Sequence, residues 1–180
     1  MHEQILIVDY GSQFTQLIAR RIRESNIYCE IHPFNHLPEI TDQIKGIILS
    51  GSPSSVTEDN APIAELDVMN LSIPVLGLCY GAQFLVASNG GSVQKSTHRE
   101  YGRANITIQQ DDHLFQGIEN GSQVWMSHGD TILDMPNDTT VLAKTNSIPV
   151  AAYKFNHRNI YAVQFHPEVS HSLDGKLLLD

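Results

Sequence analysis

The sequence predicts an α/β protein built on a doubly wound, mostly parallel sheet, with helices on both faces and antiparallel additions towards the C-terminus. The continuous apolar run Ile5–Val8 is typical of a strand buried on both faces of a parallel sheet. Residues 15–24 follow with helical spacing, because Leu17, Ile18 and Ile22 share one face while arginines occupy the others. Strand and helix patterns then alternate along the first half of the chain, as they do in parallel sheets.

The remaining elements follow in chain order. Further strands are expected at 28–31, 46–50 and 74–78, and further helices near 61–70 and 81–89. From about residue 103 the pattern changes to short strands separated by turn residues, at 103–109, 123–127, 140–144, 149–154 and 159–164. These strands predict antiparallel additions to the same sheet. Ligands of such sheets bind beyond the carboxyl ends of the parallel strands, where the segments 9–13, 50–53 and 79–81 fall.

The composition excludes several classes of function. The net charge is −9, from 11 basic and 20 acidic residues, so we expect no nucleic-acid partner and no attraction to anionic lipid. No stretch approaches the roughly 18 apolar residues of a membrane helix, and no membrane association is expected. The two cysteines, Cys29 and Cys79, are too few for a disulfide framework, which favours a reducing, cytoplasmic compartment.

Cys79 lies where a strand is expected to turn into a helix. The pattern Gly77-Leu78-Cys79-Tyr80-Gly81 has the form of a nucleophile elbow, G-x-S-x-G, with cysteine in place of serine. Such a tight reversal brings the two flanking positions together and needs small residues there. Backbone N–H groups at the helix start favour a thiolate and can bind an oxyanion. The alternative is a buried core cysteine, since free cysteine is among the most buried residue types.

A second motif supplies a partner for this cysteine. Residues 161–165 predict a strand that leads into His166-Pro167-Glu168. In extended chain, residues i and i+2 point the same way, so His166 and Glu168 are expected on one side. A carboxylate beside an imidazole fixes its tautomer and stabilises the protonated ring, which gives a nearby thiol its base. Alone, a His-x-Glu motif is more often a solvated surface pair; together with the elbow it indicates a catalytic triad.

The segments Gly77–Gln83 and Gln164–Glu168 resemble the class I (triad) glutamine amidotransferases, and the resemblance covers essentially the whole chain. Finer features resemble the branch of that family that supplies ammonia for GMP synthesis. They are Asp9–Gln13, Arg99–Gly102 and Val124–Asp130.

The resemblance implies a role for each candidate site residue. Cys79 is the expected nucleophile towards the side-chain carboxamide of glutamine, His166 its base and later the acid towards ammonia, and Glu168 the group that orients His166. The expected oxyanion donors are the backbone N–H of Tyr80 and an N–H from Gly51 or Ser52. The groups expected to hold the substrate are Gln83 and the backbone around Ser127, His128 and Gly129.

The loop before Pro53 departs from the family pattern. Family members usually carry two glycines there, whereas this chain has Gly51-Ser52. A backbone donor survives the change, because an N–H does not depend on its side chain. Serine reaches positive φ less readily than glycine, however, so the loop conformation is where the resemblance is weakest.

The function that the resemblance implies is a glutaminase domain that feeds ammonia to an ATP-pyrophosphatase domain or subunit converting XMP to GMP. No metal or cofactor is expected in this domain, and His157, His166 and His171 match no zinc spacing. ATP and Mg²⁺ are expected in the partner, and the full enzyme is expected to be a homodimer. Residues 1–180 are expected to form one domain, the excised N-terminal part of a longer synthetase, because the chain stops at residues 177–180, inside an apolar helical run.

Two alternatives remain open. One is the glutaminase subunit of another amidotransferase. The other is a cysteine-dependent hydrolase or stress protein of the same superfamily fold, although these usually lack His-Pro-Glu at the end of a late strand. A catalytically silent regulatory domain is disfavoured, because all three triad members are present.

Overall fold

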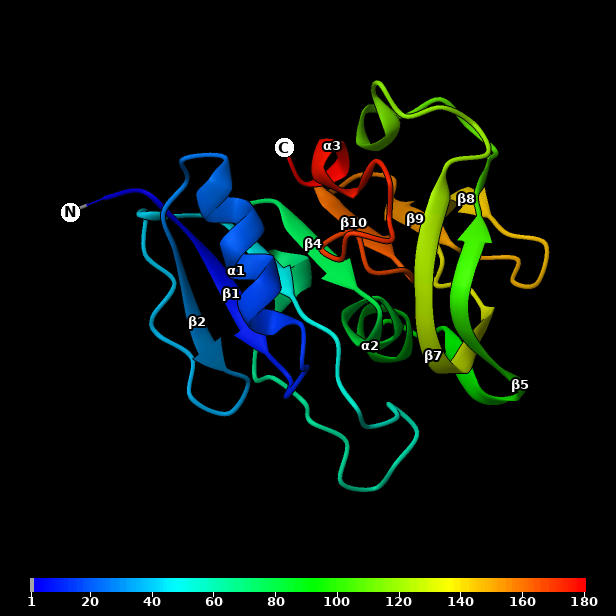
Figure 1. Ribbon diagram of the computed structural model, residues 1–180. Helices are drawn as coiled ribbons and strands as arrows, with labels where there is room; N and C mark the ends of the chain where they lie inside the picture. Colours follow the sequence, from blue (N-terminus) through cyan, green and yellow to red (C-terminus); the bar gives the residue numbers. More distant parts are fainter. Residues whose placement is uncertain (1) are drawn as a thin grey trace.

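The computed structural model describes residues 2–180, and the side chains of all of these except residues 97–100. Its main element is an eight-stranded sheet in the order β2-β1-β3-β4-β10-β9-β8-β6 (Figure 1). The strands are β1 (Gln4–Asp9), β2 (Cys29–Pro33), β3 (Ile44–Leu49), β4 (Val75–Leu78), β5 (Ser92–Asn105), β6 (Thr107–Ile108), β7 (Gln123–Asp134), β8 (Thr139–Lys144), β9 (Ala152–Phe155) and β10 (Ile160–Val163). The α-helices are α1 (Thr15–Glu24), α2 (Tyr80–Ser88) and α3 (Gly175–Leu179).

The predicted fold class is confirmed. Strands β2, β1, β3, β4 and β10 run parallel, while β9, β8 and β6 continue the sheet in antiparallel pairing. One detail of the prediction was wrong, because the last strand, β10, is not an antiparallel addition to the parallel strands. It pairs parallel with β4, with Val163 opposite Leu78, and antiparallel only with β9.

Apolar side chains alternate between the two faces of the sheet, and a helix covers each face. On β1, Leu6 and Val8 point into a core that they share with Leu85 of α2. Ile7 points the opposite way, into a core that it shares with Ile18 of α1. Both faces of the central strands are therefore buried, which explains why their sequences read as continuous apolar runs.

The helix predicted near 61–70 was wrong. Only a short 3-10 turn forms there, at Val68–Asn70, and the preceding residues lack helical hydrogen bonds. Ala64 and Val68 are buried and Leu66 is partly buried, whereas the residues between them, at 65 and 67, are exposed. This alternation has the period of extended chain rather than of a helix.

The strands predicted at 103–109 and 123–127 belong mostly to a separate structure. Strands β5 and β7 form their own two-stranded antiparallel ribbon, and only residues 107–108 join the main sheet, as β6. Both ribbon strands are longer than predicted, and Figure 1 shows the ribbon beside helix α2. No helix among residues 2–180 is long and apolar enough to cross a membrane.

Candidate active site

Cys79 occupies a sharp turn between β4 and α2. Its φ of 52° and ψ of −103° lie outside the usual regions for a residue with a side chain, as the elbow pattern predicts. The flanking glycines make the turn possible. A Cβ on Gly77 would lie 2.9 Å from the carbonyl carbon and oxygen of Gly81. A Cβ on Gly81 would lie 2.7 Å from the Cβ of Leu49. The strand and the helix therefore approach more closely than any other residue type allows.

The pairing of β4 with β10 brings the two sequence motifs together. Val163 pairs with Leu78, so the chain leaves both strands at the same end of the sheet, towards Cys79 on one side and His166 on the other. The backbone N–H of Cys79 donates to the Val163 carbonyl (2.9 Å), and that of His166 donates to the Trp125 carbonyl (3.0 Å). Neighbouring strands thus deliver a thiol and an imidazole to one point.

His166 and Glu168 form a buried pair. The exposed fraction is 3% for His166 and 0% for Glu168, and 2.7 Å separates Nδ1 of the imidazole from Oε1 of the carboxylate. Because a carboxylate can only accept a hydrogen bond, Nδ1 carries the proton of the neutral ring. Nε2 is then the ring nitrogen that can take up a further proton. Burial acts to lower the pKa of His166, but the charge and hydrogen-bonding interactions with Cys79 and Glu168 outweigh it and raise that pKa to about 10.

Neighbouring elements hold this pair in place. The ring of Phe14 meets the imidazole of His166 edge-on, with the centroids 5.0 Å apart. The Nε of Arg21 in helix α1 donates to the backbone carbonyl of Glu168 (3.0 Å). A Cβ on Gly51 would lie 3.3 Å from Cε1 of His166, so a side chain there would press on the imidazole and shift it by a few tenths of an ångström.

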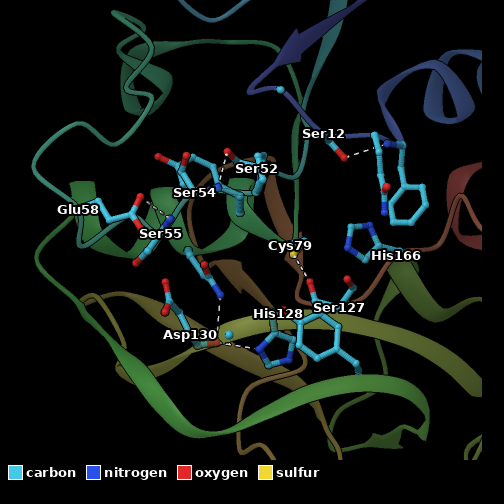
Figure 2. Close-up of a pocket in the computed structure, with 18 of the residues that line it drawn as sticks. Ser12, Ser52, Ser54, Ser55, Glu58, Cys79, Ser127, His128, Asp130 and His166 are labelled. Carbon is cyan, nitrogen blue, oxygen red and sulfur yellow. Dashed lines mark hydrogen bonds between the residues drawn. The ribbon is translucent and has the colours of Figure 1, made fainter.

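A cavity of about 480 Å³ opens over Cys79 (Figure 2). Its volume is within the range of small-molecule sites. Eight predicted site residues line it, and the other two, Gly51 and Glu168, are not part of the lining; both pack against His166. The eight are Ser52, Cys79, Tyr80, Gln83, Ser127, His128, Gly129 and His166.

The loop after β3 is anchored at its base. The carbonyl of Ser50 accepts from the Gly81 N–H (3.0 Å), and the Ser50 hydroxyl accepts from the Tyr10 N–H (3.0 Å). Among the described residues that are not glycine, positive φ values occur only at Asn26, Cys79 and Asp138. The serine that replaces the usual second glycine, Ser52, therefore sits in this loop without the backbone strain that its residue type would otherwise incur.

The amide of Gln83 is directed into the protein. Its Nε2 donates to the Asp130 carbonyl (3.1 Å) and to Oε1 of Gln164 (3.0 Å). The same Asp130 carbonyl lies 2.7 Å from Nδ1 of His128. Gln83 and His128, both predicted to hold substrate, thus contact the same carbonyl, that of Asp130. Their role towards substrate stays a prediction.

Several residues around the cavity were not predicted from the sequence. Phe14 and Glu58 line it, and Gln164 lies 3.7 Å from the sulfur of Cys79. Gln164 could have been found, since it stands two residues before His166 in the strand predicted from the sequence, a spacing that places side chains on the same side of extended chain. Three groups of lining residues come from the segments 9–13, 99–102 and 124–130 that carried the finer resemblance; they are Gly11–Gln13, Tyr101 and Ser127–Asp130. The side chains of Arg99 and Glu100 lie outside the described residues.

The side chains that could ligate a metal are dispersed. Within the part of the chain that the structure describes, no three His, Cys, Asp or Glu side chains come close enough together to hold a metal ion.

Comparison with known proteins agrees with this fold. Residues 6–180 match the family described as glutamine amidotransferase class-I. The chain is 54% identical over 180 residues to a GMP synthase [glutamine-hydrolyzing] of Cytophaga hutchinsonii, and 51% identical to one of Porphyromonas gingivalis; 99% of this chain is covered in both cases. It spans only about 35% of the length of these curated relatives.

Solved structures of related proteins have the same fold. A protein of Thermoplasma acidophilum described as one subunit of a GMP synthase superposes with a TM-score of 0.87 at 32% identity, covering 99% of this chain and 90% of that one. A glutamine amidotransferase of Thermotoga maritima has the same fold, with a TM-score of 0.79 at 20% identity and coverage of 99% and 89%.

The fold and the site together define an α/β protein with a cysteine on a strained elbow beside a buried histidine–carboxylate pair. With the family match over residues 6–180, the chain belongs to the class-I glutamine amidotransferases, as the sequence motifs indicated.

Proposed function

We propose that this chain hydrolyses glutamine to glutamate and ammonia, and that the ammonia serves the ATP-dependent conversion of XMP to GMP. The observation that carries the first part is the meeting of Cys79, His166 and Glu168 beneath a cavity of about 480 Å³. The second part is supported by relatives near 50% identity that are named GMP synthase [glutamine-hydrolyzing].

The chemistry follows from the order of the three side chains. The Cys79 sulfur attacks the carboxamide carbon of glutamine, while His166 holds the proton taken from the thiol. The carbon–nitrogen bond then breaks, and the His166 proton passes to the departing ammonia. A thioester remains on Cys79. Water, deprotonated by His166, attacks this thioester, and glutamate leaves as the thiol re-forms. Glu168 keeps the imidazole oriented and stabilises its positive charge.

The tetrahedral intermediate carries a negative oxygen that needs donors. Tyr80 begins helix α2, and the first N–H groups of a helix have no partner inside it. Its N–H is therefore one proposed donor, and an N–H of the Gly51–Ser52 loop, which is anchored through Ser50, is the other. Backbone donors fixed in advance are the usual means of stabilising such an oxyanion.

The synthetase half of the reaction is assigned to a separate unit. We propose an ATP-pyrophosphatase domain or subunit that holds ATP and Mg²⁺, in a cytoplasmic enzyme that is a homodimer when complete. The chain spans about 35% of its curated relatives, which fits one domain of a longer synthetase. A free-standing subunit is the other arrangement, as the description of the Thermoplasma acidophilum protein suggests for that protein.

Glutamate release and covalent labelling test the proposal. The chain combined with a GMP-forming synthetase, XMP and ATP is incubated with glutamine, and glutamate is measured. Cys79→Ala should abolish release, whereas Cys29→Ala should keep it, since Cys29 is buried in the core around α1. A glutamine-directed chloroketone should label Cys79 in the unmodified chain. Labelling of Cys29 instead, or full release by Cys79→Ala, would overturn the proposal.

A further inference from the structure

Two buried glutamines connect the sulfur of Cys79 to strand β7. The exposed fractions of Gln83 and Gln164 are 3% and 2%. Nε2 of Gln164 donates to Sγ of Cys79 (3.7 Å), and Oε1 of Gln164 accepts from Nε2 of Gln83 (3.0 Å). The second hydrogen of the Gln83 amide goes to the carbonyl of Asp130 (3.1 Å).

The direction of this chain of hydrogen bonds is fixed at its far end. A backbone carbonyl can only accept, so the nitrogen of Gln83, and not its oxygen, must face Asp130. The same nitrogen then requires the oxygen of Gln164 opposite it. The nitrogen of Gln164 is left to face Cys79. Turning either amide round would place two donors or two acceptors against each other in a buried site, which is costly.

The sulfur itself has a donor on one side and an acceptor on another. The carbonyl of Ser127 lies 3.6 Å from Sγ and accepts from the thiol, which favours the protonated form. The amide of Gln164 favours the thiolate, because a hydrogen bond to the charged form of a group stabilises that form. Such bonds are stronger to a charged partner than to a neutral one.

We infer that Gln164 is a positioning residue that stabilises the thiolate of Cys79, and that Gln83 acts through it by fixing the direction of its amide. The inference rests on the proposed function, because it concerns the nucleophile of that reaction. Gln83 then affects the nucleophile through Gln164, in addition to lining the substrate cavity.

Other titratable and charged groups line the same cavity or back His166, and they stay unchanged in the test. His166 follows β10 and is backed by Glu168; His128 and Asp130 come from β7. Lys95 and Tyr101 come from β5, Glu58 from the loop after β3, and Tyr80 from α2.

The test is the pH dependence of Cys79 alkylation, measured without glutamine. The chain is treated with iodoacetamide across roughly pH 5 to 10, a range that brackets most cysteine titrations, and modification of Cys79 is quantified by mass spectrometry. In Gln164→Met, which keeps a long, flexible side chain but removes the donor, the midpoint of the rate–pH curve should rise by about one unit. Alkylation at pH values well below the midpoint should then slow about tenfold.

A second variant frees the direction of the Gln164 amide without adding a charge near the sulfur. In Gln83→Met the side chain keeps its length but can no longer donate to Asp130 or to Gln164. The midpoint for Cys79 should again move to higher pH, although Gln164 is intact. Gln123→Leu is the matched control, because it removes a glutamine–carbonyl bond to His171 (2.8 Å) far from this chain of amides. Its curve should overlay that of the unmodified chain.

The outcomes separate this inference from the proposed function. If Gln164→Met folds and loses stability or glutamate release while its alkylation midpoint stays in place, Gln164 is merely structural and the inference is wrong. If Gln164→Met does not fold, the midpoint of Gln83→Met decides, and an unchanged midpoint overturns the inference. Failure of the unmodified chain to hydrolyse glutamine in any assembly counts against the proposed function alone, since alkylation needs no glutamine.

Discussion

Gly81 of helix α2 lies directly against Leu49 at the end of β3. A Cβ on Gly81 would stand 2.7 Å from Cβ of Leu49 and 2.9 Å from its carbonyl carbon, closer than real side chains approach. This contact joins the nucleophile elbow to the strand that leads into the proposed oxyanion loop. The spacing of the two proposed oxyanion donors therefore depends on the absence of one methyl group.

Gly81→Ala should destabilise the protein by about 1–3 kcal/mol, because buried backbone and a strand end must move to admit the new atom. Chemical denaturation followed by circular dichroism measures the change. Ser88→Ala is the control, since Ser88 is exposed at the other end of the same helix and should change stability by less than about 0.5 kcal/mol. Equal stability of Gly81→Ala and the unmodified chain would show that the elbow tolerates a side chain here.

The raised pKa of His166 predicts a pH dependence that Cys79 controls. Because the folded pKa of about 10 lies above the ordinary 6.5, the proton on His166 contributes stability that is fully present below about pH 6.5 and is lost as pH rises through about 10. Cys79→Ala removes a group that raises this pKa, so the imidazole should titrate at lower pH and the loss of stability should move with it. NMR titration of the imidazole measures the midpoint, with Cys29→Ala as the control. An unchanged midpoint in Cys79→Ala would mean that the thiol does not interact with the ring.

Glu168 should matter less to activity than His166. In Glu168→Gln the amide oxygen can still accept from Nδ1, but a neutral group stabilises the imidazolium less, so glutamate release should fall roughly tenfold to a hundredfold. His166→Ala removes the proton carrier and should abolish release. Steady-state kcat for the two variants, measured in the same assembly, makes the comparison. Complete loss in both would give the carboxylate a larger role than orientation and charge support.

Much of the fold was predictable because local patterns decided it. Helix α1 has the predicted bounds, since its apolar stripe is regular and isolated between two strands. The helix near 61–70 failed because its apolar residues alternate with polar ones, and burial against the core favours extended chain. The first part of β5 was not predicted, because its opening residues are mostly polar and only pairing with β7 holds them in a strand.

The site was predictable in its residues but not in its arrangement. Cys79 and His166 were found from their own motifs, but their meeting depends on the parallel pairing of β4 with β10, which neither strand's sequence specifies. Asp130 and the inward direction of Gln83 depend on where the β5–β7 ribbon packs. Such long-range packing leaves no periodic signal in the chain.

The last prediction concerns the dependence of the glutaminase on its proposed partner. Ammonia released without an acceptor is wasted, so coupling should favour a site that becomes fully active only when the synthetase docks with XMP and ATP bound. The candidate movable part is the loop that contains Ser52, Ser54 and Ser55. Beyond its anchored base at Ser50, hydrogen bonds of these three serines are local, to residues no more than three positions away. Coupling between two binding sites is typically about 1–3 kcal/mol. If docking lowers the barrier to glutamine hydrolysis by a similar amount, glutamate release should accelerate by about five- to 150-fold.

Glutamate release is therefore compared for the chain alone, for the chain with the synthetase part, and for that assembly with XMP and ATP. The rate should be lowest for the chain alone and highest for the loaded assembly. The assembly carrying Cys79→Ala should still form GMP from added ammonium but not from glutamine, because only the glutaminase site has lost its nucleophile. Full speed by the isolated chain would contradict docking control. Failure of the mutant assembly with ammonium would contradict the division of labour between two sites, since loss of one sulfur atom should leave the synthetase reaction intact.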